Sequence, residues 1–465
     1  MAGIISYGAY VPRFRLGKES LGWGMPIEKA VANYDEDSIT MAVAAGMDCI
    51  AGLKRDAVDG LFFATTTSPY IEKQGAATVA AAIDLGRNIV TNDATNSLRA
   101  GTLAMMSALD AIKAGSAKQV MVTAADTRTG PPGSDIAQAA GDGAAAILFG
   151  DKGVIANVLG SYSVSEELID LWRAEGDNNV RTWEDRFVYE TGYLKIMPEA
   201  VAGLLKKMKL TPKDITKAAF YGPTARRHAE MIKILGLDPK TQVVNPLFDQ
   251  VGNTGAAYPL MLLVSALEGA KPGDKILVVS YGDGADALLL EVTSEISKLK
   301  ARRGVKGYLA SKRILANAGL AAAWRGARTG GLSGGPPSIS ARYREREEID
   351  RLHAGKCKSC GLIQFPQQRV CSRCHTKDEW ETVRLADKKG KVFTFSLDNV
   401  MGGVDAPLAI TVTNFDGGGR GLFMMTDREI EEVRCEAPIE MTFRRLRSSG
   451  GMHNYYWKVT PIRVK

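Results

Sequence analysis

The chain lacks the features that would place it in a membrane or in an oxidising compartment. Six cysteines in 465 residues are too few for a disulfide framework. No run of about 18 apolar residues is present, so no membrane span is expected. The N-terminus has neither the basic nor the apolar segment of an export signal. These absences predict a cytoplasmic protein without membrane contact.

Aromatic residues are also sparse, at 7% of the chain, and this bears on a basic stretch between Lys298 and Arg344. Because few aromatic side chains interrupt these charges, a stacking platform for single-stranded nucleic acid is not expected. The remaining interpretations are a solvated linker and a site for the phosphates of coenzyme A. The residues we assign to coenzyme A binding are Arg302, Arg303 and Lys306.

Residues 1–295 alternate short apolar runs with amphipathic segments, which is the pattern of a layered α/β protein. A second series of segments repeats the order of the first and indicates an internal duplication. We expect the halves to be residues 1–165 and 166–298. The second half should contain a helix over residues 198–208 with proline in its first turn, where a missing N–H costs nothing.

The C-terminal third has a different pattern. A glycine-rich segment at residues 329–337 marks a linker, which we place at residues 299–340. A charged helix is expected at residues 340–352, within a region 341–385 that contains two cysteine pairs. Five short strands then predict a small β-barrel at residues 386–465. These strands are residues 392–397, 408–415, 422–425, 439–443 and 455–459.

Two C-x-x-C pairs form the strongest local signal in the sequence. They are Cys357 with Cys360 and, ten residues later, Cys371 with Cys374. Two such turns can direct four thiolates at one Zn²⁺, and four protein ligands leave no open position on the metal. The pattern therefore predicts a structural zinc ion, with four unmetallated thiols as the alternative.

Several segments of the first 295 residues resemble 3-hydroxy-3-methylglutaryl-CoA synthases, chiefly those of archaea. The segments are residues 3–12, 35–42, 125–127, 171–173, 251–255 and 271–282. The resemblance implies the thiolase fold, a duplicated layered α/β/α/β/α structure. It also implies an acyl-CoA substrate and, by analogy with other thiolase folds, a homodimer.

The C-terminal region resembles the zinc-ribbon and OB-fold proteins that accompany thiolases and related synthases. Residues 337–346, the four cysteines, residues 363–366 and Arg369 carry this resemblance. It implies an OB-type barrel that helps to hold the acyl-CoA. OB-folds also bind nucleic acid, but fusion to a thiolase-type region favours acyl-CoA, so no nucleic-acid partner is expected.

The chain departs from the synthase family at the residues that catalyse acyl transfer. That family works with a glutamate, a cysteine and a histidine. By motif, the cysteine position is Leu98, or Ser97 after a slip of one residue, while the glutamate falls on Thr66 and the histidine on Tyr221. Leucine cannot be acylated, and no base for Ser97 is evident. A covalent acyl-enzyme is therefore not expected.

Other positions of the family site are retained or have gained hydroxyl groups. In the family, Asn253 lies near the thioester, where its amide could donate to a developing enolate oxygen. The turn of Gly282 and Gly284 could complete an oxyanion hole, or could be a tight turn without function. Tyr221 and Tyr281 could transfer protons if a neighbour lowered the pKa, or could be packing residues.

These observations favour carbon–carbon bond cleavage, or formation, without a covalent intermediate. The hypothesis is an aldol or retro-aldol reaction on a β-hydroxyacyl-CoA through a thioester enolate. One alternative is retro-Claisen or hydrolytic cleavage of a β-ketoacyl-CoA, and another is acyl transfer of the synthase type. A third alternative is a non-catalytic scaffold that presents acyl-CoA to a partner thiolase.

Overall fold

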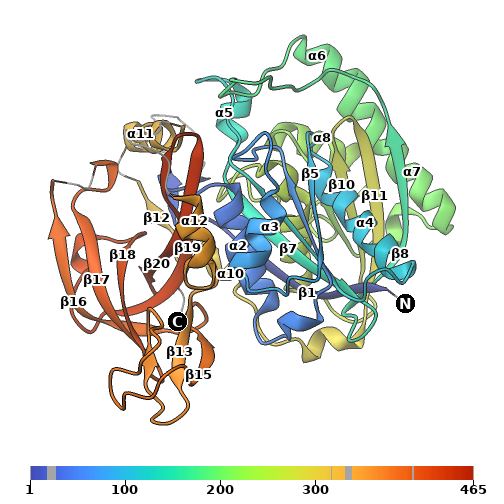
Figure 1. The fold of residues 1–465 in the computed structure, drawn as a ribbon. Helices are drawn as coiled ribbons and strands as arrows, with labels where there is room; N and C mark the ends of the chain where they lie inside the picture. The colour runs from blue at the N-terminus through green and yellow to red at the C-terminus, as the bar shows by residue number, and fades with distance from the viewer. Residues whose placement is uncertain (1, 18–27, 316, 330–337, 401–402, 464–465) are drawn as a thin grey trace. The chain divides into compact units, whose positions relative to one another are not determined.

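A computed structural model describes residues 2–17, 28–315, 317–329, 338–400 and 403–463 (Figure 1). The chain forms two compact units. The first contains Met1–Ala32, Asp37–Ala80 and Leu85–Ala318, and the second contains Asn33–Glu36, Ala81–Asp84 and Gly319–Lys465. Among the helices of these residues, none has both the length and the apolar character needed to cross a membrane.

A nine-stranded sheet forms the centre of the first unit, in the order β5-β4-β6-β7-β1-β8-β11-β10-β9. Its central strands are buried on both faces, which is why they read as continuous apolar runs rather than as alternating ones. The strands are β1 (Gly3–Tyr10), β4 (Gly60–Thr65), β5 (Val90–Thr95), β6 (Val120–Asp126), β7 (Gly143–Gly150), β8 (Ala156–Ser165), β9 (Lys217–Phe220), β10 (Lys275–Tyr281) and β11 (Gly284–Val292).

The strand directions confirm the predicted duplication. From β1 outward, the first half pairs antiparallel with β7, antiparallel with β6, then parallel with β4 and β5. From β8 outward, the second half pairs antiparallel with β11, antiparallel with β10, then parallel with β9. A parallel bridge from Ala218 to Val243 takes the place of the fifth strand. The two halves meet where β1 pairs with β8.

Helices form three layers around the two halves of this sheet. On the outside, α2 (Ser38–Ile50) packs on β1, β6 and β7, and α7 (Leu194–Met208) packs on β8, β10 and β11. Two helices contact each other in the middle layer, α4 (Ala100–Lys113) and α9 (Tyr258–Leu267). A Cβ at Gly101 would lie 2.7 Å from the Ala256 carbonyl oxygen, so glycine permits this close approach. The predicted α/β/α/β/α layering is therefore confirmed.

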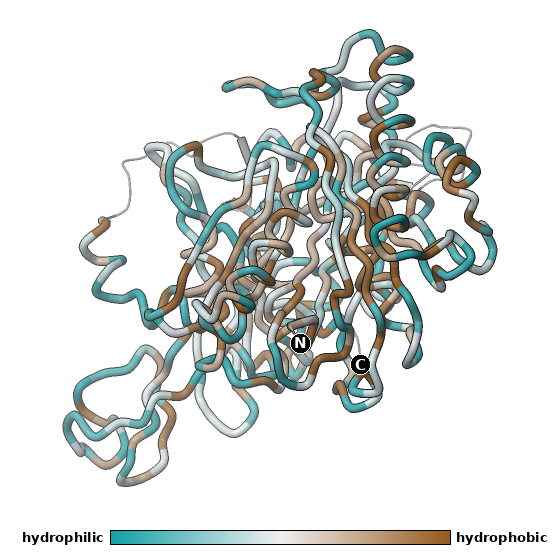
Figure 2. The backbone as a smooth tube through the Cα atoms, turned by 90° about the vertical axis from the view of Figure 1, so that its right-hand side faces the viewer, coloured by the Kyte–Doolittle hydropathy of each residue, from teal (hydrophilic) through white to brown (hydrophobic). Residues whose placement is uncertain are grey.

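The hydropathy of the chain follows these layers. Figure 2 shows hydrophobic residues along the strands and inner helices, and hydrophilic residues on the outer loops. Helix α9 is almost entirely buried, as expected for a helix that is apolar on every side. The other helices of this unit are α3 (Gly75–Ala82), α5 (Asp135–Ala139), α6 (Asp185–Val188), α8 (Ala225–Ile234) and α10 (Gly304–Leu309).

One helix of the first unit differs from the sequence-based expectation. Helix α7 starts at Leu194, directly after α6 and a π-helical turn at Tyr189–Tyr193, so Pro198 lies inside the helical run rather than in its first turn. The π-helical turn, which is wider than an α-helical one, ends just before Pro198, whose ring nitrogen has no N–H to donate. On α8, His228 is buried and stacks on Phe220.

The interval 299–340 is not a simple linker. It contains α10 and the strand β12 (Arg313–Ile314), which pairs with β2 (Phe14–Leu16), and β2 in turn pairs with β3 (Lys29–Val31). Helix α11 (Ala318–Thr329) follows. Residues 330–337, the core of the expected glycine-rich linker, lie outside the described part of the chain.

The second unit contains the predicted five-stranded barrel, closed in the order β16-β17-β18-β20-β19. Alternate residues of β17 are buried, as expected for a strand with one face toward a barrel core. The expected helix 340–352 is interrupted at Glu345, giving α12 (Ile339–Arg344) and α13 (Arg346–Ile349). The strands are β13 (His353–Cys357), β14 (Ile363–Gln364), β15 (Trp380–Arg384), β16 (Gly390–Asp398), β17 (Leu408–Phe415), β18 (Arg420–Met425), β19 (Pro438–Ser449) and β20 (Met452–Pro461).

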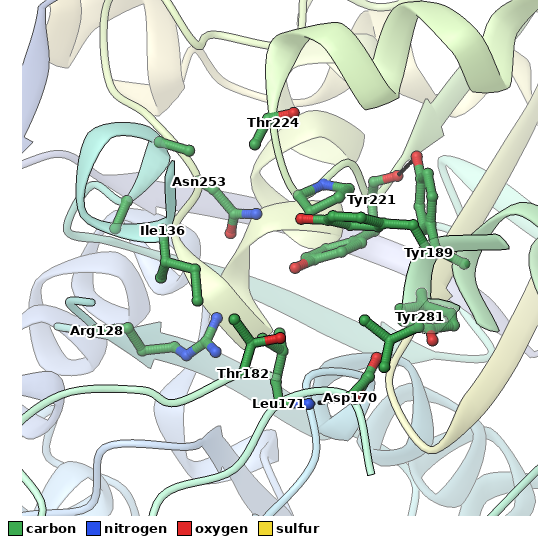
Figure 3. A pocket seen from close by; sticks show the side chains of 15 residues that line it. Arg128, Ile136, Asp170, Leu171, Thr182, Tyr189, Tyr221, Thr224, Asn253 and Tyr281 are labelled. Atoms are coloured by element: carbon green, nitrogen blue, oxygen red, sulfur yellow. Dashed lines mark hydrogen bonds between the residues drawn. The ribbon is translucent and has the colours of Figure 1, made fainter. Parts of the chain in front are cut away.

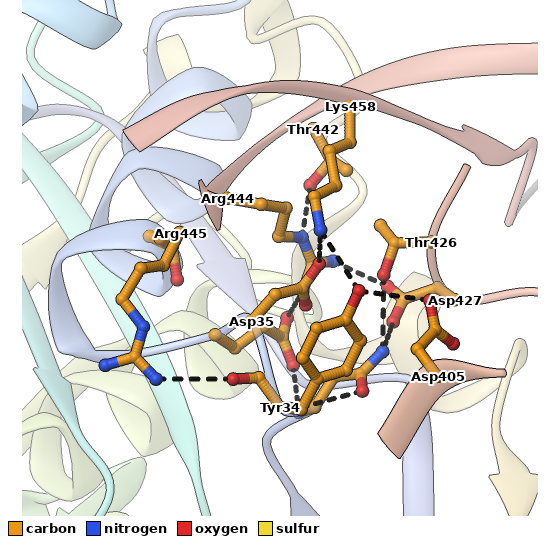
Figure 4. A network of polar contacts seen from close by, with 12 residues as sticks. Tyr34, Asp35, Asp405, Thr426, Asp427, Thr442, Arg444, Arg445 and Lys458 are labelled. Carbon is orange, nitrogen blue, oxygen red and sulfur yellow. Dashed lines mark hydrogen bonds and ion pairs between the residues drawn. The ribbon is translucent and has the colours of Figure 1, made fainter. Parts of the chain in front are cut away.

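A buried network of charges lies in the second unit (Figure 4). Lys458 and Arg444, on neighbouring barrel strands, bind the Asp35 carboxylate at 2.8 and 3.4 Å. Arg444 also binds Asp427 at 2.6 Å and pairs with Glu36. Burial opposes ionisation of Asp35, but Lys458 and Arg444 outweigh it, so the pKa of Asp35 is lowered. The short segment Asn33–Glu36 thus supplies counter-charges to the barrel.

Removing the cation at the centre of this network should destabilise the second unit. We expect Arg444→Met to lower its free energy of unfolding by about 3–5 kcal/mol, because Asp35 and Asp427 would remain buried without their counter-charge. Hydrogen exchange of peptides from β19 and β20, measured across a urea series, would report the change. The contribution of Asp35 to the free energy of unfolding is fully present above the pKa of Asp35 in the unfolded chain, about 3.9. It is lost as the pH falls through the lower pKa of Asp35 in the folded protein.

Lys391→Met is the matched control, because Lys391 pairs at 3.2 Å with Glu436 and both side chains are exposed. It should change the free energy of unfolding by less than about 0.5 kcal/mol. Equal effects of the two substitutions would contradict the role given to the network.

Candidate functional site

The carboxyl ends of parallel strands from both halves of the sheet converge on one region of the first unit. Thr66 follows β4, Asp126 ends β6, Tyr221 follows β9 and Tyr281 ends β10. Ligands of open α/β sheets bind at such edges, because the loops that leave the strands meet there. Apart from Gly284, the candidate catalytic residues named from the sequence line one of two adjoining cavities at this edge.

The inner cavity has a volume of about 40 Å³. Figure 3 shows Tyr221, Asn253 and Arg128 facing it. Asp170 and Tyr281 complete its polar lining. The structure therefore brings together three residues that the sequence singled out, Tyr221, Asn253 and Tyr281, with two that it did not.

Tyr221 lies in a cluster of tyrosine rings. Its ring centroid is 6.1 Å from that of Tyr258 and 6.3 Å from that of Tyr281, and the Tyr193 hydroxyl donates to its carbonyl oxygen at 3.0 Å. Burial raises its pKa, while the Arg128 guanidinium and the Asn253 amide oppose that rise without reversing it. The expectation of a lowered pKa was wrong, because desolvation of the phenolate outweighs the favourable neighbours. Tyr221 is a neutral phenol at rest.

The side-chain amide of Asn253 is held by two backbone groups. Its Nδ2 donates to the Gly222 carbonyl at 2.8 Å, and its Oδ1 accepts from the Gly255 N–H at 2.9 Å. These bonds fix the amide beside the Tyr221 hydroxyl, where a hydrogen bond from Asn253 works to lower the pKa of Tyr221. Because the amide nitrogen carries a second N–H, donation to an enolate oxygen stays a prediction.

Tyr281 has an acidic neighbour rather than a cationic one. Burial raises its pKa, and the Asp170 carboxylate raises it further. Burial likewise raises the pKa of Asp170, against the opposing effect of Tyr281 and the Leu171 N–H. A phenol held in this way is a poor base, so Tyr221 is the better placed of the two for proton transfer.

The outer cavity is larger, about 530 Å³, and is lined by Thr66, Ser97, Leu98 and Gly282 among others. The Ser97 hydroxyl donates to the Gly282 carbonyl at 3.1 Å, and no histidine or carboxylate accepts from it among the described residues. Of the residues that the structure describes, no cysteine or histidine lines either cavity. Ser97 thus lacks the base that an acylated serine needs.

The turn between β10 and β11 presses against Leu98. A Cβ at Gly282 would lie 2.9 Å from the Leu98 nitrogen, so a larger residue could not be placed there. Asp283 has a φ of 50°, a left-handed conformation. The Gly282 N–H donates to Gly284 within the turn, whereas the N–H groups of Leu98 and Asp283 have no acceptor in the described part of the chain. The Gly282 N–H is therefore already bonded within the turn and is not available to a ligand.

Thr66 is a partner of the buried carboxylate of Asp126. The backbone N–H and hydroxyl of Thr66 donate to it at 2.7 and 2.9 Å. Thr65, Thr67 and the Ala256 N–H donate to the same carboxylate at 2.9, 2.8 and 2.8 Å. Thr66 therefore anchors the loop after β4 to Asp126.

Sequence reasoning did not single out Arg128 or Asp170. Arg128 is nearly buried and is one of the few residues that line both cavities. Its signal was its place directly after the family-like segment 125–127, at the end of a buried strand. Asp170 likewise borders a family-like segment, since it lies directly before residues 171–173. Nothing else in the sequence marked it as a site residue.

The three residues assigned to coenzyme A binding lie around α10 and line neither cavity. Arg302 donates to the Ala51 carbonyl at 2.6 Å and to the Ser6 hydroxyl. The N–H of Arg303 donates to Asp48, and that of Lys306 to Glu268. The contacts of this group secure α10 to neighbouring elements.

The four cysteines of the second unit fit a zinc ion. Their sulfur atoms all lie within 4.8 Å of one another, with Cys357 and Cys374 at 3.5 Å and Cys360 and Cys371 at 3.6 Å. Zinc–sulfur bonds of about 2.3 Å in a tetrahedron would place the sulfurs about 3.8 Å apart. Four thiolates leave no position for substrate, so the ion would be structural.

Two family models match the chain. Residues 205–291 match the C-terminal domain of 3-oxoacyl-[acyl-carrier-protein] synthase III, and residues 344–381 match the rubredoxin-like zinc ribbon domain of ChsH2. The second match agrees with the cysteine geometry and supports a structural zinc site. The first covers the half of the sheet that contains Tyr221, Asn253 and Tyr281.

Curated relatives and solved structures extend the likeness. The chain is 34% identical over 316 residues to hydroxymethylglutaryl-CoA synthase of Methanopyrus kandleri, covering 64% of this chain and 90% of that one. It is 36% identical over 309 residues to the enzyme of the same name from Thermococcus sibiricus, covering 64% and 88%. A crystal structure of HMG-CoA synthase complexed with CoA matches with a TM-score of 0.60 at 18% identity, covering 68% of this chain and 88% of that one.

The zinc site can be tested by metal analysis. Fresh protein should contain one zinc per chain, and Cys360→Ser should lose it and disorder residues 353–384, because zinc binding supplies folding free energy to such ribbons. Mass spectrometry under native conditions and hydrogen exchange of the ribbon would show both effects. Cys435→Ser, which changes an exposed cysteine outside the cluster, is the control and should keep the metal. A folded ribbon in metal-free protein would contradict the assignment.

Proposed function

Because the chain belongs to the hydroxymethylglutaryl-CoA synthase family, we propose that its first unit makes or breaks a carbon–carbon bond in an acyl-CoA without forming an acyl-enzyme. The proposed reaction is the aldol addition, or retro-aldol cleavage, of a β-hydroxyacyl-CoA. It proceeds through the enolate of the thioester. Solved relatives include complexes with CoA and with 3-hydroxy-3-methylglutaryl coenzyme A, and these support an acyl-CoA as the substrate.

The observation that carries this proposal is the environment of the Tyr221 hydroxyl. It faces the inner cavity beside the fixed amide of Asn253 and the guanidinium of Arg128. By the resemblance, Tyr221 stands at the position of the family's histidine. A phenol that is held between a cation and an amide can give a proton to an alkoxide and take one back from a hydroxyl.

The lining of the outer cavity supports a reaction without a covalent intermediate. Leu98 stands at the position of the family's cysteine and is nearly buried. The neighbouring Ser97 hydroxyl is bonded to a backbone carbonyl rather than to a base. The apparatus for acylating a side chain is therefore missing, while the donors that would stabilise an enolate remain.

The reaction balances without an oxidant. In cleavage, hydroxide from the solvent first removes the proton of the Tyr221 phenol, and the phenolate then takes the proton of the β-hydroxyl as the Cα–Cβ bond breaks and an aldehyde or ketone leaves. The electron pair of that bond forms the enolate, whose oxygen would be stabilised by the N–H groups of Leu98 and Asp283. Water protonates the α-carbon to give the shorter acyl-CoA and restores the hydroxide, and addition is the reverse.

Two other functions make different predictions. Hydrolytic or retro-Claisen cleavage of a β-ketoacyl-CoA would release a carboxylic acid or a second thioester rather than an aldehyde or ketone. A scaffold that presents acyl-CoA would bind the thioester without turnover. The fixed geometry of Asn253 beside Tyr221 supports an enzyme over a scaffold, because a scaffold has no need for a buried, oriented phenol.

Incubation with acyl-CoA should leave the chain unmodified. We expect intact-protein mass spectrometry to show no added acyl mass after exposure to acetyl-CoA or to longer thioesters, because neither Leu98 nor Ser97 can be acylated. A Leu98→Cys variant serves as the comparison, because it places a thiol at the position that the resemblance assigns to the family's cysteine. A stable adduct on Ser97 of the wild type would overturn the non-covalent mechanism.

Tyr221→Phe should lower the rate of carbon–carbon cleavage by about 10²–10⁴-fold, because it removes the proton-transfer group and keeps the ring. Liquid chromatography with mass spectrometry would follow the released carbonyl compound and the shorter acyl-CoA. Since the pKa of Tyr221 is raised above its usual value of 10.0, cleavage by the wild type should accelerate with pH up to at least pH 10. The variant should lose that dependence.

Tyr258→Phe is the control. Tyr258 belongs to the same ring cluster, but its hydroxyl donates to the Pro246 carbonyl at 2.6 Å and it does not line the inner cavity. Its removal should change stability by about 1 kcal/mol and leave the rate within a few fold. If folded Tyr221→Phe turned over at the rate of Tyr258→Phe, the role of Tyr221 would be refuted.

A further inference from the structure

Asp170 is an acidic residue of the inner cavity that has no task in the reaction proposed above. Among the described residues that line this cavity, no other carries a carboxylate. Asp170 also lines the outer cavity, so it lies where the two spaces adjoin. In the described part of the chain it forms no ion pair. A half-buried carboxylate without a cation is costly to keep, so a use for it is expected.

The Asp170 carboxylate is held in one orientation although it belongs to a loop. The N–H of Leu171 donates to one of its oxygens at 2.6 Å, and the Tyr281 hydroxyl donates to the carboxylate as well. An antiparallel bridge between Trp172 and Arg181 closes the part of the loop that follows. Because each carboxylate oxygen can accept two hydrogen bonds, these donors leave room for a proton.

The surroundings of Asp170 make it a stronger base than an ordinary carboxylate. Burial raises its pKa, against the opposing effects of the Tyr281 hydroxyl and the Leu171 N–H. Asp283 raises the pKa further through its negative charge. A carboxyl group of raised pKa is better matched to proton transfer near neutral pH, where it can act as a base in one direction and as an acid in the other.

Asp170 and Tyr221 lie on opposite sides of the inner cavity in Figure 3. Aldol chemistry needs two separate proton transfers, one at the β-oxygen and one at the α-carbon. Two groups on opposite sides can serve these two atoms without competing for one of them. The resemblance assigns the family's glutamate to Thr66, so Asp170 is a different position in the chain.

We propose that Asp170 is the acid–base residue of the α-carbon. This inference rests on the proposed function, because it needs the thioester enolate, and it gives Asp170 the proton transfer that would otherwise fall to water. In cleavage, the carboxyl group of Asp170 gives its proton to the α-carbon of the enolate and forms the new C–H bond. The carboxylate that remains takes a proton from water in the outer cavity, which restores the hydroxide. In addition, the carboxylate removes an α-proton, and the electron pair of that C–H bond forms the enolate.

The test follows hydrogen exchange at the α-carbon of saturated thioesters, from acetyl-CoA to octanoyl-CoA, in D₂O without an aldehyde or ketone. Mass spectrometry of the thioester should show deuterium uptake with the wild type. Asp170→Asn should lower the rate of uptake by about 10²-fold or more, because it removes the base and keeps the size of the side chain. Tyr221→Phe, which should be slow in cleavage, should still exchange, because these thioesters have no β-oxygen for Tyr221 to act on.

A second variant separates a chemical role of Asp170 from a structural one. Asp170→Ala should also lose the exchange, and added formate should restore part of it by supplying a carboxylate in the space that the side chain leaves. A variant that has lost only its loop structure would not respond to formate. Failure of formate to act on a folded Asp170→Ala protein that had lost exchange would therefore contradict the proposal.

Glu190→Gln is the matched control, because it also removes one carboxylate. Glu190 is exposed, pairs with Arg186 at 2.8 Å and lines neither cavity, so its loss should leave the exchange unchanged. If folded Asp170→Asn exchanged at the rate of Glu190→Gln, the role of Asp170 would be refuted and the enolate chemistry would stand. Absence of exchange with every thioester in the wild type would overturn the enolate, and the proposed function with it.

Discussion

The carboxylate of Asp126 joins the loops that build the site. It accepts hydrogen bonds from the end of β4 through Thr66 and from the start of the central helix region through the Ala256 N–H. Both cavities are formed by residues near these loops, including Arg128, two positions further along the chain. The buried Asp126 carboxylate, with its five donors, thus ties loops from the two halves of the chain to each other. These loops lie at the edge of the sheet where the reaction would occur.

The backbone contacts around the two cavities do not depend on a nucleophilic side chain. The hydrogen bonds that hold Asn253 and the turn at Gly282 run to backbone atoms, so they do not depend on a cysteine, a histidine or a glutamate. Those backbone contacts keep the shape of the cavities whatever side chains line them. The acidity of the Tyr221 phenol is then set by burial and by Arg128.

Much of the fold could be predicted from the sequence, because the signals were local. Continuous apolar runs marked the buried strands, alternating burial marked β17, and the spacing of four cysteines fixed their common site. The site was only partly predictable. The bond that holds the Asn253 amide to Gly222, 31 residues away, has no local signal in the sequence. Arg128 became apparent only when the two cavities that it lines could be seen.

The charge network of the barrel has a consequence for how separable the C-terminal module is. Arg444 and Lys458 lie on strands near the end of the chain, yet their counter-ions Asp35 and Glu36 come from its beginning. A polypeptide cut at the glycine-rich segment would carry both cations into the barrel with Asp427 as the acidic partner that remains. The second unit is therefore electrostatically complete only when it includes the segment Asn33–Glu36 from the beginning of the chain.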